Sequence, residues 1–229
     1  MKIIKYPKRS EWAEIVKRPV LNVDALRETV KTVLDRVKAE GDKAVMEYEM
    51  LFDRVELSSL KVSEGEMQEA ETLVAAELKV ALEIAKNNIE AFHAAQRFTG
   101  KKVETQPGVV CWQKAVGIEK VGLYIPGGTA PLFSTVLMLA VPARLAGCKE
   151  IVLCTPPNKE GKVHPAILYA AKLAGVHQII KAGGVQAIGA MAYGTESVPK
   201  VYKIFGPGNQ YVMAAKQQVS LHDVAIDMP

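Results

Sequence analysis

The 229-residue chain has few of the residues from which disulfide scaffolds and metal sites are built. It contains only three cysteines, Cys111, Cys148 and Cys154, and none has the CxxC spacing of a metal knuckle. An odd number of thiols, two of them in apolar surroundings, indicates reduced core cysteines rather than a disulfide framework. The four histidines are isolated and show no ligand spacing such as HxxxH. We therefore expect no metal site in this chain and treat its histidines as caps, surface or core residues.

Long apolar runs and a strong charge are also missing. The longest apolar run, Val136 to Val141, is far too short for a membrane span, and Met1 to Arg9 lack the apolar core of a signal peptide. The net charge of +4 is mild and its basic residues are scattered, which argues against a nucleic-acid partner. We expect a cytoplasmic, soluble protein with no membrane and no nucleic-acid partner.

Two regions of the chain differ in their pattern. From Asn22 to Arg97, apolar residues recur at helix spacing and Gly41 provides a stop. Within this region Asp42 is a candidate cap, and Ser63 with Glu66 has the pattern of a capping box. A short strand is expected at 109–112. The N-terminal region, residues 1–118, is therefore predicted to be helical.

From residue 119 onward, short apolar strands alternate with helices. We expect strands at 121–125, 151–154, 178–181 and 201–204, followed by helices at 134–146, 165–175, 185–193 and 210–219. Strands this short and this continuously apolar are typical of a parallel sheet buried on both faces. The sequence predicts an α/β fold in which residues 119–229 form a Rossmann-like parallel-sheet domain beside the helical N-terminal region.

Three of these strands end in glycine-rich loops, at Pro126-Gly127-Gly128, at Gly183-Gly184 and at Gly206-Pro207-Gly208. In an alternating fold these junctions lie at the carboxyl edge of the sheet, where such sheets bind ligands. Glycine lets the backbone approach a ligand closely, and the helix start that follows offers N–H groups to an anion. Three such loops in one half-chain indicate a nucleotide or another phosphate-bearing ligand.

Three polar residues accompany these loops, although no loop matches the GxGxxG or GxxxxGK[ST] motif. Tyr124, Gln186 and Asn209 should all project into one crevice, where a phenol and two amides can bond to a ribose or a base. Asn209 as a helix cap and Gln186 as a solvated first-turn residue are equally good interpretations. Ser134-Thr135 can be read either as a phosphate contact or as an N-cap. The carboxylate pairs Glu47/Glu49 and Glu69/Glu71 are predicted to be solvated surface charges. We find a binding edge but no catalytic set.

Three segments closely resemble the histidinol dehydrogenase family: residues 121–140, Gly183 to Ile188, and Lys203 to Asn209. The closing residues 225–229 resemble the start of that family's signature segment. The resemblance implies an NAD-dependent, zinc-containing homodimer of about twice this length, with a fold similar to that of aldehyde dehydrogenases. It implies oxidation of L-histidinol to L-histidine through L-histidinal. By the same resemblance, Tyr124, Gln186 and Asn209 are the NAD contacts.

Several further expectations follow from the resemblance. The family's catalytic Glu-His pair and zinc ligands lie beyond Pro229, so we expect a fragment that is inactive alone and holds no zinc. The resemblance also implies that residues 1–118 belong to a domain that further sequence completes. We therefore expect the apolar helix faces within 22–97 to be exposed or to contact another copy of the chain. Two alternatives remain open. One is a stand-alone nucleotide-binding module with a fully covered sheet. The other is an aldehyde-dehydrogenase relative with a cysteine thiolate as its nucleophile.

Overall fold

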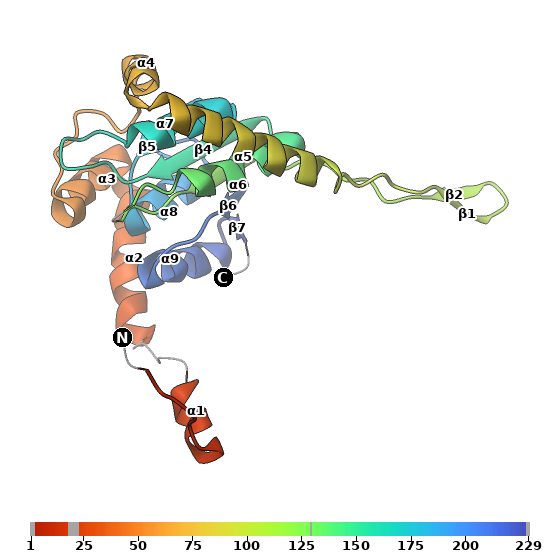
Figure 1. Ribbon diagram of the computed structural model, residues 1–229, viewed down its shortest axis with the longest axis horizontal. Coiled ribbons are helices and arrows are strands. Elements are labelled where there is room, and N and C mark those ends of the chain that lie inside the picture. The colour runs from red at the N-terminus through yellow and green to blue at the C-terminus, as the bar shows by residue number, and fades with distance from the viewer. Residues whose placement is uncertain (1–2, 18–22, 129, 228–229) are drawn as a thin grey trace.

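A five-stranded parallel sheet forms the centre of the computed structural model. The structure describes residues 3–17, 23–128 and 130–227; for residues 23–25 it describes only the backbone. All neighbouring strands are parallel, and the chain changes direction across the sheet between β3 and β6. The sheet order is β5-β4-β3-β6-β7 (Figure 1), with the bounds β3 (Lys120–Tyr124), β4 (Glu150–Thr155), β5 (Gln178–Lys181), β6 (Lys203–Phe205) and β7 (Ala225–Ile226). The predicted α/β fold with a parallel sheet is confirmed.

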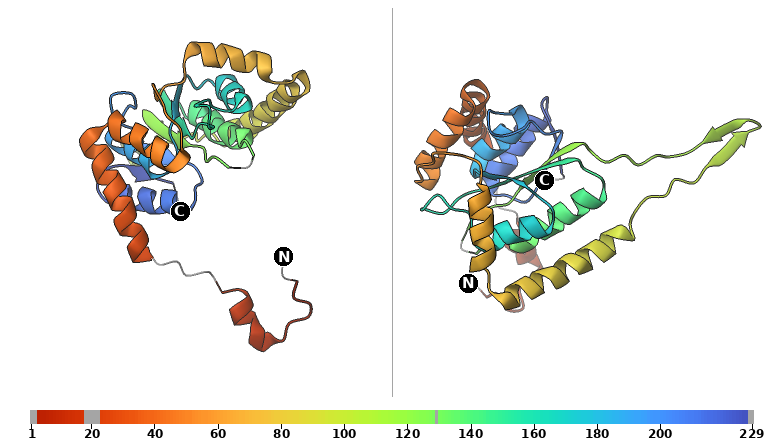
Figure 2. Two further views of the ribbon diagram at one scale, coloured as in Figure 1. Left: turned by 90° about the vertical axis from the view of Figure 1, so that its left-hand side faces the viewer. Right: turned by 90° about the horizontal axis from the view of Figure 1, so that it is seen from above.

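Helices cover both faces of the sheet, as a parallel sheet requires. One face carries α2 (Val23–Glu40), α3 (Asp42–Tyr48), α8 (Gly184–Tyr193) and α9 (Gln210–Ser220). The other carries α4 (Glu64–Leu73), α5 (Ala76–Ala94), α6 (Phe133–Leu145) and α7 (Pro165–Leu173). Figure 2 shows these two layers on opposite sides of the strands. Before them stand the short η1 (Arg9–Glu11) and α1 (Trp12–Ile15).

The alternation of side chains along each strand divides the apolar residues between two cores. Tyr124 and Cys154 face the core shared with α2, α3, α8 and α9. Leu123 and Leu153, their neighbours in the chain, face the core shared with α4 to α7. Both cores contain side chains from the predicted N-terminal region and from the predicted sheet domain. The division at residue 118 stays a prediction.

The apolar faces of the N-terminal helices are covered more fully than expected. In α2, buried residues recur at helix spacing and pack with α8 and α9, and α3 also buries its apolar side chains, so the predicted exposure is wrong for both helices. Their apolar stripes fit the face of the sheet that α8 and α9 leave open. The expectation is confirmed for α5, whose Val80, Ile84 and Phe92 are more than half exposed.

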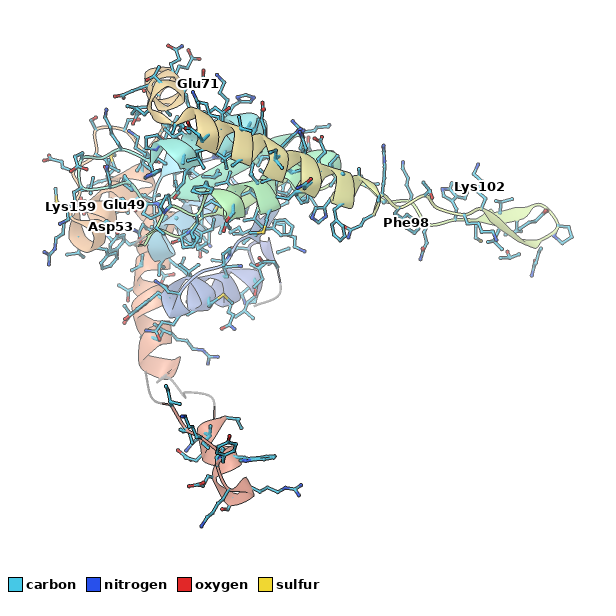
Figure 3. All side chains as sticks on the ribbon, viewed as in Figure 1. Glu49, Asp53, Glu71, Phe98, Lys102 and Lys159 are labelled. Atoms are coloured by element: carbon cyan, nitrogen blue, oxygen red, sulfur yellow. The ribbon has the colours of Figure 1, made fainter. Side chains whose placement is uncertain are left out.

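A two-stranded hairpin projects from the body of the molecule beyond the end of α5 (Figure 1). It consists of β1 (Val103–Gln106) and β2 (Val109–Cys111), paired antiparallel, and the side chains of both strands are exposed. Figure 3 shows Phe98 and Lys102 on this arm. The strand predicted at 109–112 therefore exists at 109–111, but it turns back on its neighbour and does not join the parallel sheet.

Local signals in the N-terminal region are confirmed in one case and wrong in another. The backbone N–H of Glu66 donates to Ser63 Oγ at 3.2 Å, and the backbone N–H of Ser63 donates to Glu66 Oε2 at 2.9 Å, so the capping box forms. Asp42, in contrast, does not cap α3. Its carboxylate accepts from Thr195 Oγ1 and from the backbone N–H of Ser197, because the loop after α8 lies against the start of α3.

The segment before α4, residues 60–62, protects one edge of the sheet. The backbone N–H of Val62 donates to the carbonyl of Ile179 at 2.9 Å, and that of Lys181 donates to the carbonyl of Leu60 at 2.7 Å. These bonds pair the segment before α4 antiparallel to the edge strand β5. An unpaired edge is a template for aggregation, so this pairing removes one exposed edge of the sheet.

Gly122 in β3 has no room for a side chain. A Cβ there would lie 2.5 Å from Met191 Sδ and 3.2 Å from Val201 Cγ2. We expect Gly122→Ala to lower the free energy of unfolding by about 1–3 kcal/mol, because the packed core must shift to admit the methyl group. As a control, Gly65→Ala in α4 places its Cβ 3.8 Å from the nearest side chain. It should leave stability unchanged or raise it, and equal urea midpoints for the two variants would contradict the prediction.

Candidate functional site

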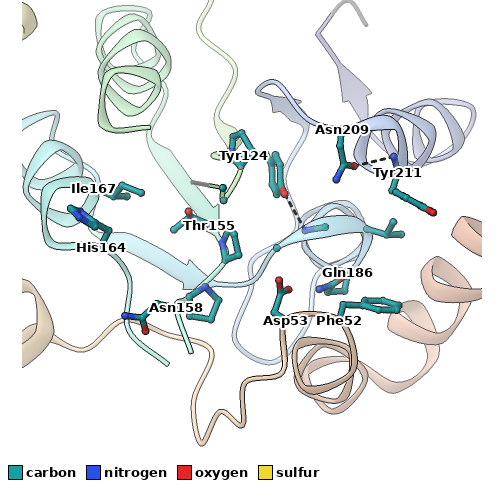
Figure 4. Close-up of a pocket in the computed structure, with 18 of the residues that line it drawn as sticks. Phe52, Asp53, Tyr124, Thr155, Asn158, His164, Ile167, Gln186, Asn209 and Tyr211 are labelled. Carbon is teal, nitrogen blue, oxygen red and sulfur yellow. Dashed lines mark hydrogen bonds between the residues drawn. The ribbon is translucent and has the colours of Figure 1, made fainter. Parts of the chain in front are cut away.

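A cavity of about 880 Å³ lies at the carboxyl edge of the sheet (Figure 4). Its volume is within the range of about 300–1,000 Å³ typical of ligand pockets. The walls come from the ends of β3, β4 and β5 and from the starts of α7, α8 and α9, together with η2 (Glu49–Asp53), a π-helical turn that follows α3. The three residues selected from the sequence, Tyr124, Gln186 and Asn209, all line this one cavity.

Tyr124 connects the end of β3 to the start of α8. Its side chain is buried, and its hydroxyl oxygen accepts the backbone N–H of Gly184 at 3.0 Å, the bond drawn in Figure 4. Burial raises the pKa of the phenol to about 12, so the hydroxyl keeps its proton at neutral pH. The proton can therefore be donated onward to a ligand in the cavity while the oxygen holds the glycine loop.

Gln186 is not the solvated first-turn residue of the alternative interpretation, because it is only 1% exposed. Its Nε2 group donates to Glu49 Oε1 at 2.7 Å, and the backbone N–H of Gly183 donates to the same oxygen at 2.9 Å. The other amide atom, Oε1 of Gln186, has no hydrogen-bond partner among the described residues. A buried acceptor without a partner is rare in a native fold, so it marks a position that a ligand donor can fill.

Asn209 serves as the N-cap of α9, which confirms the alternative role suggested by the sequence. Its Oδ1 accepts the backbone N–H groups of Tyr211 at 3.0 Å and Val212 at 3.1 Å. Capping uses only the oxygen of the side chain. The amide nitrogen makes no hydrogen bond within the part of the chain that the structure describes, and the residue is exposed. Asn209 can thus cap its helix and donate to a ligand at the same time.

The electrostatic character of the cavity comes from helix ends rather than from basic side chains. The starts of α7, α8 and α9 all border it, at His164, Gly184 and Asn209. Over residues 3–17, 23–128 and 130–227, no lysine or arginine lines it. Helix N-termini carry partial positive charge, which suits a phosphate or pyrophosphate. His164 is itself a cap, since its Nδ1 accepts the backbone N–H of Ala166 at 3.2 Å.

Sequence reasoning missed the carboxylates of η2. Glu49 was predicted to be solvated, but it is completely buried, because the π-helical turn directs its side chain under the Gly183-Gly184 loop. Asp53, on the same turn, lines the cavity. One signal was available: Val45, Tyr48 and Phe52 mark an apolar face, and Glu49 falls on that face at the i+4 position from Val45.

Other sequence candidates lie away from the cavity. Helix α6 begins at Phe133 with Leu132 as its N-cap, so Ser134 is not the cap, and neither it nor Thr135 lines the cavity. Glu69 and Glu71 form surface ion pairs with Lys162 and Lys172, as expected for solvated charge.

The cysteines do not offer a nucleophile at the cavity. Cys154 is buried in β4 and its pKa is raised by that burial, and burial also raises the pKa of Cys148. A thiol with a raised pKa is mostly protonated at neutral pH and therefore a poor nucleophile. Cys111 is exposed on the projecting hairpin. None of the three lines the cavity, which argues against the cysteine-thiolate alternative.

The described residues hold neither a cluster of metal ligands nor a membrane-spanning helix. No group of three or more histidine, cysteine, aspartate or glutamate side chains within them is placed to hold a metal ion. No helix among the described residues is long and apolar enough to cross a membrane.

The fold and the cavity define a Rossmann-like α/β protein with a ligand-sized pocket at the carboxyl edge of its sheet. A family model described as histidinol dehydrogenase matches residues 16–229. The chain belongs to the histidinol dehydrogenase family.

The relatives extend beyond this chain. Histidinol dehydrogenase from Bacteroides thetaiotaomicron is 72% identical over all 229 residues, which are 54% of its length. The Escherichia coli K12 protein of the same name is 52% identical over 94% of this chain and 50% of its own length. The crystal structure of histidinol dehydrogenase from Elizabethkingia anophelis superposes with a TM-score of 0.92 at 53% identity, covering 97% of this chain and 52% of that one. The chain spans about half the length of the curated relatives it matches.

The buried Glu49 carboxyl should make stability depend on pH. Burial raises its pKa from 4.5 to about 7, the bonds from Gly183 and Gln186 oppose the rise, and the charge of Asp53 adds to it. A raised carboxyl pKa means that the folded state holds the proton more tightly. The stability that this proton contributes is therefore complete below pH 4.5 and is lost as the pH rises through 7.

We expect the free energy of unfolding of the wild type, relative to Glu49→Gln, to fall by roughly 3 kcal/mol between pH 4.5 and pH 8. Urea denaturation of both proteins at a series of pH values measures this difference. Subtracting the value for Glu49→Gln removes the contribution of the other carboxyl groups. A difference that is constant with pH, or that grows as the pH rises, would show that Glu49 does not hold a proton in this environment.

Proposed function

We propose that this chain is the NAD-binding part of a histidinol dehydrogenase, an oxidoreductase that converts L-histidinol to L-histidine through L-histidinal. The observation that carries the proposal is the convergence of Tyr124, Gln186 and Asn209 on one cavity. Membership of the family supports the substrate and the reaction. The resemblance to the family supports NAD as the cofactor and, for the whole enzyme, a zinc ion and a homodimeric assembly.

The residues of the cavity fit a dinucleotide. Asn209 offers an amide donor, Gln186 offers a buried acceptor without a partner, and the start of α8 offers its partial positive charge to a pyrophosphate. Gly127 and Gly183 keep the walls close, since a Cβ at either would lie less than 3.0 Å from the ring of Pro156. The NAD that these residues would hold supplies a hydride acceptor for the alcohol carbon of the substrate. The chain's own contribution is to bind and orient that cofactor.

Catalysis and zinc binding belong, in this proposal, to the part of the relatives that the chain does not span. The described residues contain no group of three or more side chains placed to ligate a metal ion. The cavity is formed from this chain alone, at one edge of the sheet. A cofactor site usually buries most of its ligand, and in this proposal the missing part of the enzyme completes that enclosure. We therefore expect the chain alone to bind NAD weakly and not to oxidise histidinol.

A stand-alone nucleotide-binding module is the second candidate. One observation favours it, because both faces of the sheet are covered by helices from this chain. Two observations weigh against it: the hairpin β1–β2 and the outer face of α5 expose apolar side chains that an independent module would cover. The two candidates share the cavity and differ in whether the chain works with further sequence.

A calorimetric titration of the purified chain with NAD tests the proposal directly. We expect one site per chain with a Kd on the order of 0.1–1 mM, because the ligand is only partly enclosed. Absorbance of NADH should not rise when L-histidinol is added, and metal analysis should find no stoichiometric zinc. Turnover by this chain alone, or one zinc per chain, would show that the catalytic residues were placed wrongly.

Two substitutions of Asn209 separate its capping role from cofactor binding. Asn209→Ala removes the cap and should lower the free energy of unfolding by about 1 kcal/mol. Asn209→Asp keeps an acceptor for the N–H groups of Tyr211 and Val212 but replaces the amide donor with a negative charge beside the pyrophosphate. It should retain wild-type stability while weakening NAD binding by about tenfold. Wild-type affinity in Asn209→Asp would reduce Asn209 to a cap.

A further inference from the structure

One corner of the cavity brings three hydrogen-bond acceptor side chains together. This acceptor corner consists of Asp53 and Gln186, which line the cavity, and of Glu49, which lies behind them against the Gly183-Gly184 loop. Glu49 Oε2 and Gln186 Oε1 are buried and have no hydrogen-bond partner among the described residues. Figure 4 shows Asp53 and Gln186 on this side of the cavity. These two buried oxygens and the Asp53 carboxylate need hydrogen-bond donors, which a ligand or a bound proton can supply.

The acceptor at Gln186 is set by Glu49. An amide side chain can turn either its oxygen or its NH₂ group toward a ligand. Here the NH₂ group donates to Glu49 Oε1 at 2.7 Å, and that oxygen is held in turn by the backbone N–H of Gly183. Because Glu49 Oε1 already accepts the Gly183 N–H, it acts as an acceptor here and pairs with the NH₂ end of the amide. Gln186 Oε1 is therefore the atom left for the ligand.

Asp53 occupies the position that matters for a ribose. In doubly wound sheets the adenosine half of a dinucleotide lies over the first strands, and an acidic side chain near the end of the second strand bonds the ribose hydroxyls. The second strand, β4, ends in Thr155 and then prolines and an asparagine, without an acid. Asp53 reaches this edge from η2 instead. Its carboxylate lies close to Gly183 and to Pro156, the residue after β4: a Cβ built on Gly183 would lie 3.4 Å from Asp53 Oδ2 and 2.8 Å from Pro156 Cβ.

Resting on the proposed function, we propose that Asp53 and Gln186 are specificity-determining residues, with Glu49 as the positioning residue behind them. The acceptor corner takes the hydroxyl donors of an unmodified ribose and rejects the 2′-phosphate of NADP. A phosphate dianion offers acceptors only, and it would face a carboxylate in a partly buried site. No lysine or arginine among the described residues lines the cavity, and Arg54, which follows Asp53, lies outside its lining. Sites that accept the 2′-phosphate use such a cation.

The test compares NAD with NADP binding to the purified chain at pH 8, above the pKa of about 7 of Glu49, so that the Glu49 carboxyl and the 2′-phosphate are ionised. We expect the wild type to prefer NAD by at least about tenfold. Asp53→Asn removes the charge, so NADP affinity should rise and the preference should fall about fivefold or more, with NAD affinity changing much less. Glu56→Gln, an equal charge change at an exposed neighbour, is the matched control and should leave the preference unchanged.

Two variants of Glu49 test its positioning role. Glu49→Leu removes the acceptor and frees the Gln186 amide to turn its NH₂ group toward the cavity, so the preference for NAD should fall. Glu49→Gln keeps an oxygen for Gly183 and Gln186 and should retain most of the preference. A merely structural role for Glu49 would change the affinity for both dinucleotides together and would leave their ratio alone. Circular dichroism spectra confirm that each variant is folded.

The outcomes distinguish this inference from the proposed function. If NAD and NADP bind the wild type equally, or if folded Asp53→Asn keeps the wild-type ratio, the acceptor corner does not select the cofactor and the inference is wrong. If neither dinucleotide binds, the proposed function fails and the inference fails with it. NAD binding with a preference that Asp53→Asn weakens and Glu56→Gln does not supports both.

Discussion

A parallel sheet must bury both of its faces, and the arrangement of this chain depends on how that requirement is met. The crossover helices α6 to α9 cover only part of the two faces. The remaining surface is covered by helices that precede the sheet in the chain, with α2 and α3 on one side and α4 and α5 on the other. This packing carries η2 to the carboxyl edge of the sheet, so the covering of the core also brings two carboxylates to the cavity.

Glu49 illustrates the tension between stability and binding at that edge. A buried carboxylate is costly unless it is paired and hydrogen-bonded, and Glu49 has only the bonds from Gly183 and Gln186 on one oxygen. An apolar side chain would pack there at lower cost but could not hold the glycine loop or orient the amide. The buried acceptors without partners lie beside the cavity, where a ligand or a proton can satisfy them. This distribution fits a binding site better than a structural core.

Short-range patterns were sufficient for most of the elements. Helix spacing identified α2 and α5, a capping box identified the start of α4, and strand-glycine-helix alternation placed the strands to within one or two residues. The sequence was less informative where contacts between distant segments decide the structure. Asp42 has the chemistry of a cap, yet its carboxylate bonds to the loop at 195–197. The strand at 109–111 has the apolar pattern of a sheet strand, yet its partner is the neighbouring β1.

The sequence by itself determined the fold class, the family and the shared position of Tyr124, Gln186 and Asn209, because a parallel sheet brings every strand-to-helix loop to one edge. It could not show that Gln186 is buried or that Glu49 lies beneath the Gly183-Gly184 loop. Only the tertiary structure decided these points. They depend on contacts between residues more than 130 positions apart, such as Glu49 with Gly183, and local spacing does not encode such contacts.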